Sequence, residues 1–148
     1  MRAGAKTYRT TTFLNVDLDI SSRDDLAGLA DAFRPRLIAL HVGRLRRRYW
    51  ARFEPRAQPR NPDIAIRRLV AAIEGLPARQ RACWRRAARR DFNIGIQAAE
   101  RPHDSAFAIS AATLKAAAAV GARIVITVYG ALSPVRGESP GPGAVVLT

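Results

Sequence analysis

The clearest periodic signal in the chain is the alternation of apolar and polar residues over positions 13–20. An extended chain places successive side chains on opposite faces. One face then carries Leu14, Val16, Leu18 and Ile20, and the other carries Phe13, Asn15, Asp17 and Asp19. We expect a strand with one buried face and one polar face.

Four further segments, 37–42, 49–54, 91–97 and 123–129, have the length and residue types of strands. Residues 44–48 between the second and third strands are expected to form the exposed connection of a hairpin. A glycine inside a strand weakens its packing, so Gly95 indicates a bulge or a close neighbour.

Four helices are expected between these strands. Ser22 with Asp25 three positions later resembles a capping box, and apolar residues at helical spacing follow as far as 33. Asn61 followed by proline is typical of a helix start, and a third helix is expected over 78–90. Ser110 is the expected N-cap of the last helix, 111–120.

The resulting order β-α-β-β-α-α-β-α-β predicts an α+β fold. Its first six steps, with the paired helices counted as one, match the split βαβ of ferredoxin-like folds, in which the first strand is interior. We therefore expect a two-layer sandwich with an added helix and a fifth strand at an edge. Residues 11–130 are the expected single domain, with a flexible N-terminus over 1–10 and a flexible tail rich in proline and glycine over 131–148.

Charge is the main anomaly of composition, because the 148 residues carry a formal net charge of +13. Residues 34–101 hold 18 arginines and five acidic residues, so they account for the whole excess. A positive field of this kind attracts nucleic acid, acidic lipid or an acidic protein. Only two of the basic residues are lysines, and a codon pool rich in arginine would produce the same bias without a function.

The first candidate site is an arginine surface formed by the hairpin and the third helix. Arginine forks match carboxylate and phosphate groups, and neighbouring aromatic residues would add stacking. The alternative is an ordinary solvated surface. The residues are Arg44, Arg46, Arg47, Arg48, Arg79, Arg81, Arg85, Arg86, Arg89 and Arg90.

The second candidate site is the polar face of the sheet. Asp17 and Asp19 share this face, so their carboxylates could bind a divalent cation or perturb each other's pKa. The alternative is a solvated face on which Asp17 or Asp19 pairs with Arg52. The binding residues expected here are Asn15, Asp17, Asp19, Trp50, Arg52, Asn93, Gln97 and Tyr129, with Glu54, Thr127 and His41 nearby.

No spacing in the chain amounts to a catalytic or metal-binding signature. The single cysteine, Cys83, lies beside Trp84 in a helical pattern and is expected to be a small buried residue. No apolar run approaches the roughly 18 residues of a membrane span. We expect a cytoplasmic protein without a membrane span, a cofactor, a bound metal or catalytic residues.

Three stretches resemble a family of small uncharacterised bacterial proteins. They are FLNVDLDI over 13–20, DFNIGIQ over 91–97 and GARIVITVYG over 121–130. Some proteins of similar build resemble immunity partners in bacterial toxin systems, which implies a protein-binding role. The arginine load over 44–90 departs from the family, whose members are more acidic.

The sequence thus favours a non-enzymatic protein-interaction module, immunity-like in character, that holds an acidic protein partner. Sequence-independent binding of nucleic acid by the arginine surface is the first alternative. A metal-dependent enzyme that uses Asp17 and Asp19 is the second. The oligomeric state is left open.

Overall fold

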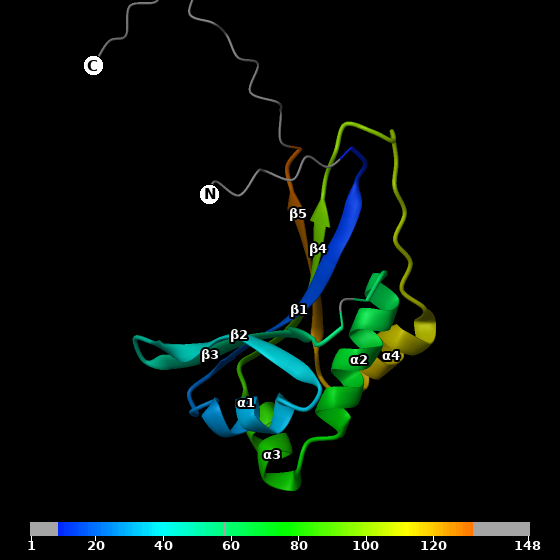
Figure 1. Ribbon diagram of the computed structural model, residues 1–148. Coiled ribbons are helices and arrows are strands. Elements are labelled where there is room, and N and C mark those ends of the chain that lie inside the picture. The colour runs from blue at the N-terminus through cyan, green and yellow to red at the C-terminus, as the bar shows by residue number, and fades with distance from the viewer. Residues whose placement is uncertain (1–8, 58, 132–148) are drawn as a thin grey trace, which may run out of the picture.

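Five strands form one sheet in the computed structural model, which describes residues 9–57 and 59–131 (Figure 1). The strands are β1 (Thr12–Ser22), β2 (Leu37–Leu45), β3 (Arg48–Pro55), β4 (Arg89–Gln97) and β5 (Arg123–Tyr129). The helices are α1 (Ala27–Phe33), α2 (Pro62–Glu74), α3 (Ala78–Arg86) and α4 (Ala111–Ala119). The predicted order of elements is therefore confirmed. The predicted flexible termini, except for residues 9, 10 and 131, lie outside the described residues.

The strand order is β2-β3-β1-β4-β5. β1 is antiparallel to both of its neighbours, β3 and β4, which is the arrangement of a split βαβ core. β5 is parallel to β4 and lies at the edge, because α4 provides the crossover between them. The expected ferredoxin-like core with an interior first strand and an added edge strand is confirmed.

The helices pack on one side of the sheet and leave the other side open (Figure 1). The alternation in β1 explains this, since Val16, Leu18 and Ile20 face the helices and are almost fully buried. Phe53 and Phe92 continue the same apolar layer on β3 and β4. The polar residues of the strands therefore face the open side. No helix among the described residues has the length and apolar character of a membrane span.

Two predicted helix boundaries are wrong. Ser22 is the last residue of β1, and its hydroxyl accepts a hydrogen bond from the Asp24 amide, while α1 begins five residues later. A local serine turn therefore replaces the expected capping box. The third helix ends at Arg86 and not at Arg90, because the chain must enter β4 at Arg89 to pair with β1.

Gly95 has the close neighbour that its place in a strand predicts. β1 carries a bulge between Phe13 and Asn15, opposite this glycine. A Cβ atom on Gly95 would lie 2.6 Å from the Asn15 Oδ1 atom. Only glycine therefore fits without a shift of Asn15.

Candidate binding site on the open face of the sheet

A row of polar and charged side chains crosses all five strands on the open face. The strand register places one member of the row on each strand, so that neighbours in the row are neighbours across the sheet. From β5 to β2 the row is Arg123, Asp91, Asp19, Arg52 and His41.

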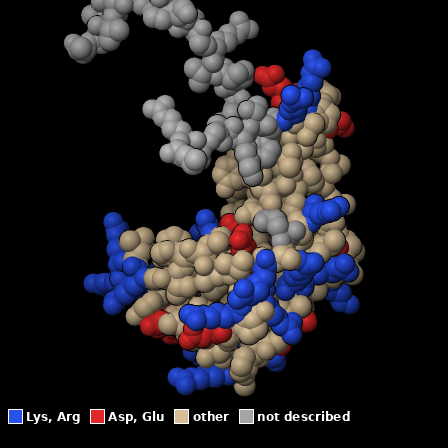
Figure 2. All heavy atoms as spheres, in the orientation of Figure 1, with Lys and Arg blue, Asp and Glu red and all other residues tan. Residues whose placement is uncertain are grey.

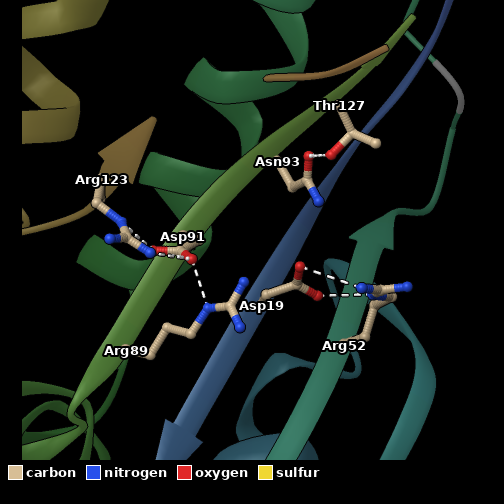
Figure 3. Close-up of polar contacts among 7 residues, drawn as sticks. All are labelled: Asp19, Arg52, Arg89, Asp91, Asn93, Arg123 and Thr127. Carbon is tan, nitrogen blue, oxygen red and sulfur yellow. Dashed lines mark hydrogen bonds and ion pairs between the residues drawn. The ribbon is translucent and has the colours of Figure 1, made fainter. Parts of the chain in front are cut away.

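Three arginines hold the two carboxylates of this row (Figure 3). Asp19 accepts two hydrogen bonds from Arg52, at 2.6 Å from Nε and 3.2 Å from Nη2. Asp91 accepts two from Arg123, both at 2.9 Å, and one from Arg89 Nε at 2.5 Å. The Arg89 guanidinium lies between the two aspartates. Positive and negative groups thus alternate, which lets two adjacent carboxylates share one face.

Asp91 is 1% exposed and is the most deeply buried carboxylate of the row. Burial alone would raise its pKa, but the hydrogen bonds and charges of Arg123 and Arg89 outweigh burial and hold the pKa below its ordinary value. The hydrogen bond to Asp19 raises the pKa of Arg52. Asp91 and Asp19 therefore fix the positions of arginines on the sheet surface.

Asp17 lies in the next row and has a weaker set of partners. Asn15 Nδ2 donates to its Oδ1 at 2.9 Å, and Arg52 Nε is 3.8 Å from its Oδ2. Burial raises the pKa of Asp17 to about 6, with Asp19 and Glu54 adding to the rise and Arg52 opposing it. The carboxyl group is therefore more easily protonated in the folded protein than in the unfolded chain.

Replacing Asp17 with asparagine is expected to stabilise the protein at pH 7. The folded pKa is raised, so ionisation of Asp17 lowers stability as pH rises from about 4 to 6. The variant should gain about 1–2 kcal/mol at pH 7 and nothing at pH 4. Urea unfolding at both pH values measures the difference in stability between the parent and the variant. An equal difference at pH 4 and pH 7 would contradict a raised pKa of Asp17.

A hollow of about 680 Å³ lies on the open face where the β2–β3 hairpin meets β1 and β4. Its wall combines arginines, one aspartate and apolar groups. The lining residues are Asp19, Ile20, Ser21, Leu45, Arg46, Arg47, Arg48, Trp50, Arg52 and Arg89. The His41 ring packs against Trp50, with 4.2 Å between the ring centres, and supports the indole from the β2 side.

The hairpin arginines give this hollow its excess positive charge. Arg46, Arg47 and Arg48 form no ion pair with any residue that the structure describes, whereas Arg52 and Arg89 are each paired with an aspartate. Basic side chains gather at the tip of the hairpin (Figure 2). An anionic group that enters the hollow would therefore meet cations that have no competing carboxylate.

The predicted arginine surface does not form one face. Arg46, Arg47, Arg48 and Arg89 line the hollow, whereas Arg44 on β2, Arg90 on β4 and the arginines of α3 lie outside it. Arg86 pairs with Asp24, Arg81 donates to the carbonyls of Glu74 and Leu76, Arg90 packs over Trp84 and Arg44 over Tyr49. Arg79 and Arg85 lie on α3 and are outside the hollow. The premise that Arg89 and Arg90 continue the helix is wrong.

The predicted polar sheet face is present but extends well beyond the hollow. Asp19, Trp50 and Arg52 line the hollow, whereas Asn15 and Asp17 lie further along β1. Asn93 accepts a hydrogen bond from Thr127 at 2.8 Å. Gln97 and Tyr129 pair at the far end of β4 and β5, where Gln97 donates to the Gly130 carbonyl.

Sequence reasoning missed Asp91, Arg123 and Leu45 as members or neighbours of this site. Alternation within β4 placed Asp91 on the same face as Asn93, so a signal for Asp91 was present. Arg123 faces Asp91 only because β5 pairs parallel to β4, and a parallel register leaves no local trace in sequence. Leu45 extends β2 into the segment that the sequence assigned to the connection.

The oxygens of Asp17 and Asp19 are not arranged as a shared cation site. Both oxygens of Asp19 are engaged by Arg52. Among residues 9–57 and 59–131, no three His, Cys, Asp or Glu side chains are grouped as a metal site would need. The hypothesis of a metal-dependent enzyme stays a prediction that this geometry does not favour.

Comparison with known protein families, curated proteins and solved structures finds no match to this chain. The resemblance to a bacterial family and to immunity proteins therefore stays a prediction.

Proposed function

We propose that the protein is a non-enzymatic interaction module whose open-face hollow binds an acidic segment of a partner protein. The observation that carries this proposal is the placement of Trp50 among arginines without acidic partners. Tryptophan and arginine are the residues most enriched at the energetic centres of protein interfaces. Leu45, 62% exposed, adds apolar surface to the same hollow. This combination suits a segment with both carboxylate and apolar side chains.

The ion pairs of the sheet support the proposal through pre-organisation. Arg52 and Arg89 are held by Asp19 and Asp91, so they lose little conformational freedom when a ligand binds. The hairpin arginines are exposed and lie further out. They would accelerate the encounter with an acidic partner through long-range attraction.

The backbone conformation at the hairpin tip also supports the proposal. Arg46 has a φ of 58°, in the left-handed region that favours glycine. An arginine at this position costs backbone energy that glycine or asparagine would avoid. We take this local strain as support for a role of its side chain. An immunity protein that holds an acidic toxin would be one instance of such a module.

Replacing Trp50 with alanine is expected to weaken binding of an acidic peptide by roughly tenfold or more, as for an aromatic residue at an interface centre. The probe is a synthetic peptide in which glutamates flank a leucine, titrated calorimetrically at low salt. Arg67→Ala is the matched control, because Arg67 lies on α2 in the helical layer and pairs only loosely with Asp63, at 3.6 Å. Equal affinities of parent and Trp50→Ala would contradict the proposal.

Single-stranded nucleic acid is the second candidate ligand, and the same tryptophan favours it. A base can stack on Trp50 while phosphates meet Arg46, Arg47 and Arg48. The two candidate ligands differ in how they would use Leu45. A leucine of the peptide can pack on it, whereas a phosphate cannot. An oligodeoxythymidine that displaces the peptide, with a steep loss of affinity as salt rises, would favour nucleic acid.

A further inference from the structure

A second hollow, of about 490 Å³, adjoins the first at the end of the sheet. It is lined by Ser22, Arg23, Asp24, Arg48, Arg86 and Ala88. Arg48 lines both hollows, so the two are contiguous across this side chain. The first hollow lies on the open face, and the second adjoins it where β1 ends at Ser22 and the chain enters β4 after Ala88.

The second hollow is also basic. Arg23 and Arg48 form no ion pair with a residue in the described ranges, and Asp24 is the one carboxylate in the wall. Asp24 pairs with Arg86 Nε at 2.7 Å, which leaves the terminal nitrogens of Arg86 without an acceptor among the described residues and holds the guanidinium beside the hollow. The hydrogen bond that the Asp24 amide donates to the Ser22 hydroxyl closes the loop beneath it. Three guanidinium groups therefore face one carboxylate.

We propose that the two hollows form one track, so that the partner presents an extended acidic segment that passes over Arg48 and places a second acidic group between Arg23 and Arg86. This inference rests on the proposed function of the first hollow. An extended chain can run from the first hollow over the shared Arg48 side chain into the second. A single small anion fills one hollow at most.

Two peptides test the track. The short one is the glutamate–leucine peptide that fits the first hollow, and the long one continues through a flexible spacer to a second pair of glutamates. We expect the long peptide to bind roughly tenfold more tightly, as two further exposed charge contacts allow. Arg23→Ala should remove most of that advantage and leave the affinity for the short peptide unchanged. Arg23 has no ion pair in the described chain, so its removal leaves the fold intact.

Each outcome has a distinct meaning. A long peptide that binds no tighter than the short one, or one whose advantage survives in Arg23→Ala, would overturn the track and leave the first hollow in place. A short peptide that fails to bind, or binds Trp50→Ala as well as the parent, would overturn the proposed function itself. Arg67→Ala controls for the loss of one positive charge, and it should lower both affinities by the same small factor.

Discussion

Replacing Trp84 with alanine is expected to lower the free energy of unfolding by about 3–5 kcal/mol, the usual cost of a buried tryptophan. Trp84 is 2% exposed and lies in α3. Its indole Nε1 donates to the Val120 carbonyl at 2.8 Å and so links α3 to the end of α4. The substitution would leave a cavity and a carbonyl without its donor at the same place.

Trp84→Phe is the matched variant for this prediction. It keeps most of the apolar volume and removes the hydrogen bond, so it should cost about 1–2 kcal/mol. Urea unfolding followed by circular dichroism measures both. If the two variants lost the same stability, or if alanine cost less than phenylalanine, the account of Trp84 as a filled core position that also satisfies Val120 would be wrong.

The second large effect is expected at Asp91. Asp91→Asn should cost about 2–4 kcal/mol, because it removes the charge that two arginines share and leaves a buried amide in its place. The arginine side chains are 51% and 68% exposed, so solvent screens part of the loss and keeps it below that of a fully buried pair.

The pH dependence separates this electrostatic cost from a simple packing defect. The folded pKa of Asp91 is depressed below its unfolded value of about 3.9. The stability that the ionised carboxylate contributes is therefore fully present above the unfolded pKa and is lost as pH falls through the folded pKa. The difference between parent and Asp91→Asn should therefore shrink from pH 7 to pH 3. Asp31→Asn, at an exposed pair with Arg34, should change stability by about 0.5 kcal/mol or less. A difference that stayed constant with pH would contradict the assignment.

Local pattern predicted most of the fold, because alternation and helical spacing report burial directly. The buried face of β1, the hairpin and the neighbour of Gly95 all follow from short stretches of sequence. The predicted end of α3 at Arg90 was wrong for a physical reason. Residues 78–90 continue a helical arginine pattern, but pairing with β1 draws Arg89 and Arg90 into β4. Tertiary pairing outweighs local propensity here.

Part of the site could also be predicted from the sequence. The sequence offers the pairing of an aspartate in β1 with Arg52 as one alternative, and this pairing is confirmed for Asp19. The hollow was not predicted, since it needs the tip of the hairpin to lie beside Arg89, far away in sequence. Such a juxtaposition depends on strand order and twist, which composition and spacing do not encode.

The binding site in the open-face hollow is tested by following the acidic-peptide titration residue by residue, through the amide chemical shifts of the labelled protein. We expect the shifts to gather at the tip of the hairpin, at Trp50 and at the start of β4, the segments that line the hollow. Residues of α2 and α4 should not respond, because they pack on the other side of the sheet. Shifts confined to the helical layer, or spread evenly over every exposed arginine, would contradict a binding site in the open-face hollow.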